Sequence, residues 1–259
     1  MDKRVLKYAF FPLTIFISMM VAGLLLTQAH AMEPGFTPGE FAVDESGAAQ
    51  YTVPLAVPPA TAGMGPALVL RYNSRSGNGL LGQDWTLGGL SVVTRCAPSF
   101  GQDGFVGGIS FDENDRYCID GQRLIAISGT DGSDGTEYRT EIDAFTKVIS
   151  HGQQGNGPAW FEVWTKSGQH MRYGFTEDAR IEAHGRDDVR LWAVDRITDT
   201  AGNYLTVNYI ENDAEGSYRP DSILYTGNEQ INLLPYNKVH FDYESRPDIT
   251  TSYRVFNMR

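Results

Sequence analysis

Residues 57–96 read VPPATAGMGPALVLRYNSRSGNGLLGQDWTLGGLSVVTRC, which has the pattern of a strand, a glycine-rich loop and a second strand. From Ala67 to Asn73, apolar residues occupy every second position, as in a β-strand that buries one face more deeply than the other. Ser74 to Gly82 contains three glycines among polar residues, which favours a turn over a helix. The segment Leu87–Arg95 predicts the second strand, and Trp85 is expected to fill the space beside the glycines.

The rest of the chain predicts an all-β fold, a long antiparallel meander of hairpins. An aromatic content of 12% and 28 glycines favour strands and turns. No helix longer than about two turns is expected. Strands are predicted at Phe41–Val43, Tyr51–Val57, Gly108–Phe111, Arg123–Ser128, Ala159–Thr165, His170–Phe175, Leu191–Thr198, Tyr204–Ile210, Ser222–Thr226 and Lys238–Tyr243.

The N-terminus has the pattern of a signal peptide over residues 1–31. Lys3, Arg4 and Lys7 precede an apolar run from Tyr8 to Leu26, and Ala29-His30-Ala31 is an A-x-A cleavage site. The alternative is an uncleaved anchor, because the apolar run approaches the length of a membrane span. Pro12 and the A-x-A ending favour cleavage after Ala31. We therefore expect a secreted protein whose mature domain is 32–259.

The net charge of −11 makes two classes of partner unfavourable. An acidic protein repels nucleic acid and anionic membrane surfaces. No cofactor is expected either. Gly77 to Gly82 has the letters G-x-G-x-x-G, but Gln83 to Gly89 does not begin the helix that a dinucleotide site requires.

Cys96 and Cys118 are the only cysteines. In an oxidising compartment they can form one disulfide, and closing the loop between them would stabilise the fold by about 3 kcal/mol. Two free buried thiols are the alternative. The chain has no C-x-x-C, so neither a cysteine zinc site nor a redox motif is expected, and no metal site is predicted.

Several long segments resemble the N-terminal domain of the SpvB/TcaC family. This family comprises plasmid-virulence B proteins and the B components of insecticidal toxin complexes. The resemblance extends from about Gly39 to about Asn228 and implies a structural part of a secreted toxin, without a catalytic site and with proteins as partners. It is carried by AGMGPALVLRYNSRSGNGLLGQDWTLGGLSVVTRC (62–96), QDGF (102–105), FDENDRYCIDGQRL (111–124), DGTEYRTEIDAF (134–145), GNGPAWFEVWTKSGQHMRYG (155–174) and WAVDRITDTAGNYLTVNY (192–209).

Two further features bear on that resemblance. Asp199-Thr200-Ala201-Gly202-Asn203 followed by tyrosines is similar to the tyrosine-aspartate repeats of RHS proteins, which implies part of an RHS-like β-shell. ADP-ribosylating relatives carry an E-x-E motif in a separate domain, whereas Glu137 and Glu141 have a different spacing. The family chain continues beyond the point that corresponds to Tyr253–Arg259, so we expect a C-terminally truncated module that a partner completes.

The sequence contains few candidates for catalysis. It has no G-x-S-x-G, H-E-x-x-H or P-loop motif, and His151, His170, His184 and His240 show no ligand spacing. We therefore expect no enzymatic activity. The acidic turns Asp112–Asp115 and Asp131–Asp134 lack the order of a calcium loop, so solvated turns are expected there.

One segment supports an alternative function, a free-standing extracellular protein that binds or cleaves glycans. Trp160, Glu162 and Trp164 would share one strand face, which could form an aromatic platform for sugars. The favoured interpretation is that both tryptophans fill the core and that Glu162 lies at a strand edge.

Overall fold

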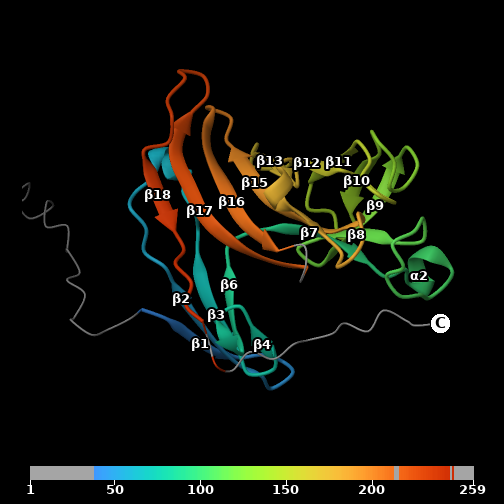
Figure 1. The fold of residues 1–259 in the computed structure, drawn as a ribbon, viewed down its shortest axis with the longest axis horizontal. Helices are drawn as coiled ribbons and strands as arrows, with labels where there is room; N and C mark the ends of the chain where they lie inside the picture. The colour runs from blue at the N-terminus through green and yellow to red at the C-terminus, as the bar shows by residue number, and fades with distance from the viewer. Residues whose placement is uncertain (1–37, 213–215, 246, 248–259) are drawn as a thin grey trace, which may run out of the picture. The chain divides into compact units, whose positions relative to one another are not determined.

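The computed structural model describes residues 38–212, 216–245 and 247 (Figure 1). The predicted signal peptide with its cleavage site after Ala31, and the segment Tyr253–Arg259, lie outside the described residues. Nearly all regular structure is β-strand, which confirms the all-β prediction. Helical structure among the described residues consists of α2 (Phe100–Asp103) and two single 3-10 turns, Thr61–Gly63 and Glu177–Ala179.

A four-stranded antiparallel sheet contains the N-terminal strands. Its order is β1 (Glu40–Val43), β2 (Ala49–Pro54), β3 (Val69–Asn73) and β6 (Trp85–Gly88). The glycine-rich loop forms the small hairpin of β4 (Asn78–Gly79) and β5 (Gly82–Gln83). There the Gly77 N–H donates to the carboxylate of Asp84. Asp84, rather than Trp85, therefore occupies the glycine loop, and Trp85 packs on Tyr72 of β3 with the ring centroids 5.5 Å apart.

The second sheet closes on itself. Consecutive strands from β7 to β13 pair antiparallel, and both β7 and β13 then pair with β15. This meander confirms the predicted hairpin arrangement, and we call it the ring. Its strands are β7 (Val92–Cys96), β8 (Arg116–Ile119), β9 (Gln122–Ser128), β10 (Glu137–Thr140), β11 (Lys147–His151), β12 (Trp160–Trp164), β13 (His170–Tyr173) and β15 (Val189–Thr198).

Further strands extend this sheet beyond β15. β16 (Asn203–Asn212), β17 (Ser217–Asn228) and β18 (Asn237–His240) follow in order, and β14 (Arg180–Glu182) pairs with the first half of β15. The long β16–β17 hairpin and β18 lie at one side of the molecule, next to β15 (Figure 1).

Aromatic side chains fill the interior of the ring. Trp192 on β15 is fully buried, and its ring meets Phe161 and Tyr117 edge-on at 5.0 and 5.6 Å. The indole N–H donates to the carbonyls of Pro158 and Ala159, each at 3.1 Å, which satisfies its polar atom. Because the centre is occupied by packed rings, the ring is a hydrophobic core and not a channel.

The structure corrects two predicted strands. Leu87–Arg95 is not one strand, because β6 ends at Gly88 in the small sheet and β7 begins at Val92 in the ring. Gly89 makes the crossing at φ 100°, and a Cβ there would collide with the Ala67 carbonyl, so only glycine fits. Gly108–Phe111 forms no strand, because the backbone of this segment binds the Asp115 carboxylate instead.

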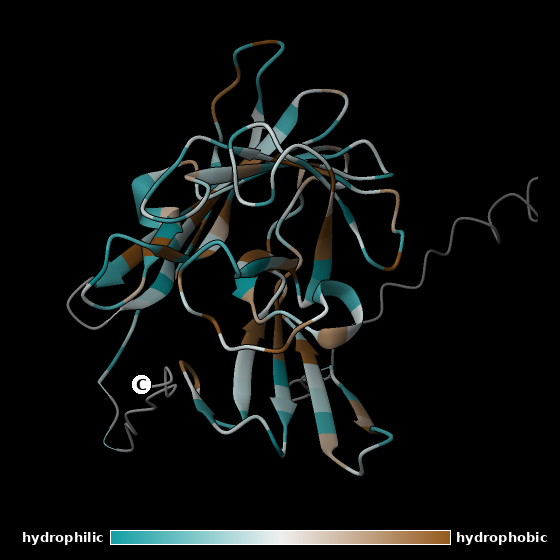
Figure 2. Cartoon of the chain, turned by 90° about the vertical axis from the view of Figure 1, so that its right-hand side faces the viewer, coloured by the Kyte–Doolittle hydropathy of each residue, from teal (hydrophilic) through white to brown (hydrophobic). Residues whose placement is uncertain are grey.

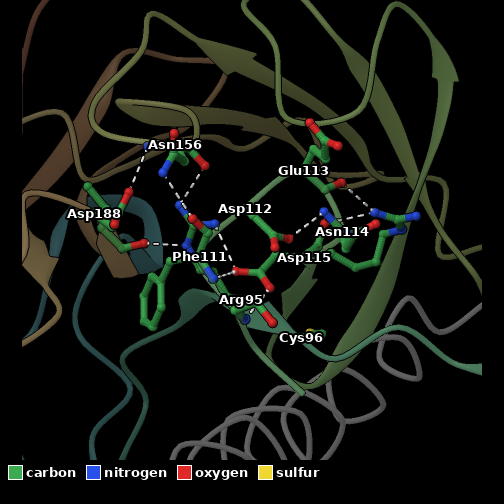
Figure 3. Close-up of polar contacts among 12 residues, drawn as sticks. Arg95, Cys96, Phe111, Asp112, Glu113, Asn114, Asp115, Asn156 and Asp188 are labelled. Atoms are coloured by element: carbon green, nitrogen blue, oxygen red, sulfur yellow. Dashed lines mark hydrogen bonds and ion pairs between the residues drawn. The ribbon is translucent and has the colours of Figure 1, made fainter. Parts of the chain in front are cut away.

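A buried arginine joins the ring to two of its loops (Figure 3). Arg95 on β7 donates to the Val189 carbonyl at 2.6 Å, to Asp115 at 3.0 Å and to the Asn156 carbonyl at 3.0 Å. Asp115 also accepts from the N–H groups of Ser110 and Phe111 at 2.7 and 2.8 Å. Both side chains are almost wholly removed from solvent, at 1% and 0% exposure.

A disulfide links β7 to β8. Cys96 and Cys118 are bonded, with their Cα atoms 6.0 Å apart, which is within the usual range for a disulfide. Cys96 lies opposite Arg116 and Cys118 lies opposite Thr94, so the bond runs diagonally across the strand pair. It closes the loop that contains α2 and Asp115.

We predict that replacing both cysteines with alanine lowers the free energy of unfolding by about 3 kcal/mol, because the open loop gains entropy in the unfolded chain. Urea titration of the non-reduced wild type and the double variant measures this difference. Reductant serves as the control, since it should lower the wild-type stability to a similar degree and leave the variant unchanged. Equal stability of the wild type with and without reductant would contradict the bond.

We predict that Asp115→Asn lowers the free energy of unfolding by about 3–5 kcal/mol, because it leaves the buried Arg95 charge without its partner. Glu113→Gln removes the same charge from the neighbouring exposed position and should change the stability by less than about 0.5 kcal/mol. Chemical denaturation of both variants tests the difference. Equal effects would show that the ion pair contributes little.

Candidate functional site

The segment Trp160–Trp164 forms β12, with the face assignment opposite to the favoured prediction. Phe161 and Val163 are buried in the ring, whereas Trp160, Glu162 and Trp164 are half-buried on its outer face. The prediction that both tryptophans fill the core is therefore wrong. The prediction that Glu162 lies at a strand edge is also wrong, because it sits in the middle of β12, between β11 and β13.

The structure brings two histidines to this face, one on each neighbouring strand. His151 stacks on Trp160 at 4.1 Å with the planes 15° apart, and His170 stacks on Trp164 at 5.3 Å and 28°. Glu162 lies between them, 3.0 Å from His151 Nε2 and 2.5 Å from His170 Nε2. We call these five residues, His151, Trp160, Glu162, Trp164 and His170, the Trp–His face.

Charged and aromatic residues surround the Trp–His face. Phe175 meets Trp160 edge-on at 5.1 Å, and the guanidinium of Arg172 lies 4.2 Å from the Phe175 ring centroid. Arg172 also pairs with buried Asp195 at 2.8 Å. Burial raises the pKa of Asp195, while Arg172 and the N–H of Phe175 act in the opposite direction. The Lys147 ammonium lies 5.4 Å from the Trp164 ring.

The hydrogen bonds of the Trp–His face define what it can do. A carboxylate only accepts hydrogen bonds, so each Nε2 donates to Glu162, and the three polar groups are held in one arrangement. The arrangement therefore places an oriented carboxylate between two half-buried tryptophan rings.

Sequence reasoning did not connect His151 and His170 with Glu162, because they lie 11 and 8 residues away on the two neighbouring strands, and their contact depends on the register of the strands. The signal was the register of the hairpins, since His151 lies opposite Trp160 and His170 opposite Trp164. The other two predicted histidines do not join them. His184 lines an open acidic cavity of about 770 Å³, and His240 lies on β18 beside Asp221.

The acidic turns are used internally. Asp115 is buried and paired with Arg95, which corrects the prediction of a solvated turn. Asp112 accepts a hydrogen bond from the Asn114 N–H. Asp131 lies 3.5 Å from Arg116, and Asp134 accepts from the Gly152 N–H. Burial raises the pKa of Asp131. In the described part of the chain, no group of three or more acidic, histidine or cysteine side chains is arranged to hold a metal ion.

None of the helices within residues 38–212, 216–245 and 247 has the length and hydrophobicity needed to cross a bilayer.

Three solved structures share this fold at low sequence identity. The N-terminal domain of the effector protein SpvB from Salmonella typhimurium strain LT2 is 19% identical, with a TM-score of 0.54, covering 75% of this chain and 74% of that one. TcdB2-TccC3-TEV is 17% identical, with a TM-score of 0.61 and coverage of 78% and 10%. A Photorhabdus luminescens Tc holotoxin pore is 18% identical, with a TM-score of 0.55 and coverage of 73% and 10%.

These likenesses establish the fold, and this chain spans only about a tenth of the toxin-complex chains it matches. No curated protein matches the chain. The family model described as Salmonella virulence plasmid 65kDa B protein matches residues 43–234, from the end of β1 to the turn before β18. This confirms the resemblance seen in the sequence segments. The chain therefore belongs to the SpvB family, a family of virulence-related proteins.

Proposed function

We propose that the chain is a non-enzymatic scaffold module of a secreted bacterial toxin or virulence complex. The observation that supports this most strongly is its fold, which recurs as about a tenth of much longer chains in the TcdB2-TccC3 and Tc holotoxin structures. In those proteins the fold is one structural part of a large assembly. A packed ring of strands suits such a part, because it is rigid without a ligand.

The use of the charged side chains is consistent with a structural role. Arg95, the centre of the most buried ion pair, makes its contacts with backbone carbonyls and Asp115. Asp103 on α2 binds both Arg116 and Arg123, at 2.7 and 2.8 Å. These charges therefore hold loops against the ring.

The partners on this proposal are proteins, namely RHS or tyrosine-aspartate-repeat chains or other toxin-complex subunits. The export signal in the sequence directs the chain through the periplasm to the exterior. We place its function outside the producing cell, in an assembly that delivers a toxin to a host.

We expect native mass spectrometry of the protein, recovered without reductant from the medium of cells that produce it, to find it in a complex larger than the monomer. The chain in that complex should begin at Met32. The other masses would identify the partner, because each subunit contributes its own mass. A protein found only as a monomer in the medium would contradict the scaffold function.

A second candidate function is glycan binding by the Trp–His face. The specific observation in its favour is the position of Trp160 and Trp164, half-exposed on the outside of the ring beside a fixed carboxylate. Aromatic rings next to oriented hydrogen-bonding groups suit the apolar faces and hydroxyl groups of sugars.

For this second function we expect a glycan-array signal that falls at least about tenfold in Trp160→Ala, as for a central aromatic contact. Trp85→Ala is the matched control, because it removes a half-buried tryptophan from the other sheet and should keep the signal. An array on which the wild type binds nothing, or on which both variants lose the same signal, would exclude the Trp–His face as a glycan site.

A further inference from the structure

The four-stranded sheet has one apolar and one polar face. Directly opposite residues share a face, and the register aligns Phe41, Tyr51, Tyr72 and Trp85 across all four strands. We call these four residues the aromatic row. The reverse face carries Glu40, Gln50, Thr52, Arg71 and Thr86.

Only part of the apolar face is covered by the rest of the described chain. Val53 is buried, Leu68 belongs to the core, and Leu87 packs against it. The outer end of the aromatic row is not covered by described residues. Phe41 is 69% exposed, and Val43, on the same face of β1, is 61% exposed. In Figure 2 the strands of this sheet project below the rest of the molecule. A large exposed apolar area at the end of a sheet is typical of an interaction surface.

Among the residues that the structure describes, no strand pairs with the outer edge of β1. The Asp44 N–H donates to the Ala48 carbonyl, so hydrogen-bonded pairs with β2 fall at every second residue, at Ala42 and Glu40. The Ala49 carbonyl accordingly points to β3, where it accepts from the Ser74 N–H. The N–H and C=O groups of Phe41 and Val43 therefore point away from β2, toward an added strand.

This edge is protected against pairing with its own copy. In the antiparallel register that uses both outward-facing residues, Phe41 of one copy pairs with Val43 of the other, and Glu40 then faces Asp44. Like charges in opposite positions destabilise a strand pair. The Asp44 carboxylate accepts from Ser46, Ala48 and Gln50, and these hydrogen bonds, that to the Ser46 side chain foremost, lower its pKa to about 2, so it remains charged.

We propose that β1 and the aromatic row bind an extended strand of a partner protein, with alternating apolar residues flanked by lysine or arginine. The backbone of that strand pairs with Phe41 and Val43, its apolar side chains extend the aromatic row, and its basic residues face Glu40 and Asp44. Adding a strand to an open sheet edge is a general mode of protein recognition. This inference rests on the proposed scaffold function and specifies where its partner binds.

The first test uses a synthetic peptide of known sequence and the mature chain. In acetyl-Thr-Lys-Val-Thr-Val-Lys-Thr-amide, the lysines can face Glu40 and Asp44 while both valines lie on the apolar side. We expect it to slow hydrogen exchange at the amides of Phe41 and Val43. The same peptide with both lysines replaced by glutamate should bind at least about fivefold more weakly, since two cross-strand charge pairs change sign.

Proline variants on two end strands, β1 of the small sheet and β18 of the larger sheet, provide a matched pair. Val43→Pro removes one outward N–H and leaves the β1–β2 hydrogen bonds in place, so it should abolish peptide binding. Lys238→Pro makes the same change on β18, an end strand of the larger sheet, where Val239 and Phe241 make the bonds to β17, and should have no effect. Glu40→Lys lies on an exposed position and should abolish the preference between the two peptides, because each peptide then has one attractive and one repulsive charge pair.

Four outcomes would overturn the proposal. They are equal binding of both peptides, binding without protection at Phe41 and Val43, equal loss in Val43→Pro and Lys238→Pro, and a wild-type dimer that Val43→Pro dissociates. The native complex separates this proposal from the scaffold function. If wild type and Val43→Pro enter that complex equally, the docking edge is wrong and the scaffold function stands. If wild type enters no complex, the scaffold function fails, and peptide binding still reports on the edge.

Discussion

The buried pair of Arg95 and Asp115 is the interaction on which the arrangement of the ring and its loops depends. A guanidinium and a carboxylate lose much hydration energy in the interior, so the pair is tolerated only when its remaining donors and acceptors are satisfied. Here Val189, Asn156 and the Ser110–Phe111 backbone supply those partners. The pair thereby fixes β7 against the start of β15, which is where the ring closes.

Ring closure explains why chemistry-bearing residues lie on loops and outer faces. The interior is occupied by Trp192, Phe161, Tyr117 and Tyr138, which pack edge-to-face. The polar side chains of His151, Glu162 and His170 lie on the outer face, where neighbouring strands bring them together. The Trp–His face is one such cluster, and its residues come from three consecutive strands.

The sequence predicts the strands better than it predicts their environment. Alternation located β3, β9, β12, β15 and β16, because a period of two depends only on local residues. It could not show which face of β12 is buried, since both faces contain large aromatic residues, and hydrophobicity favoured the tryptophans. The charged side chain of Glu162 was the local indication that the face of β12 with Trp160 and Trp164 is the outer one. The contact of Asp115 with Arg95 joins residues 20 positions apart, and those of the two histidines depend on the register of consecutive hairpins. No single strand segment reveals either.

The ring and the small sheet differ in whether their strands have unpaired edges, and this difference indicates where a partner strand can bind. The ring leaves β7 and β13 without open edges, because both pair with β15. The end strands of the small sheet are β1 and β6. β1 has neither proline nor lysine to block an added strand, and it lies between two acidic side chains, Glu40 at its start and Asp44 directly after its last residue. Acidic ends repel a second copy of an acidic chain but attract a basic strand. An edge that is open and selective in this way is suited to an assembly of different chains.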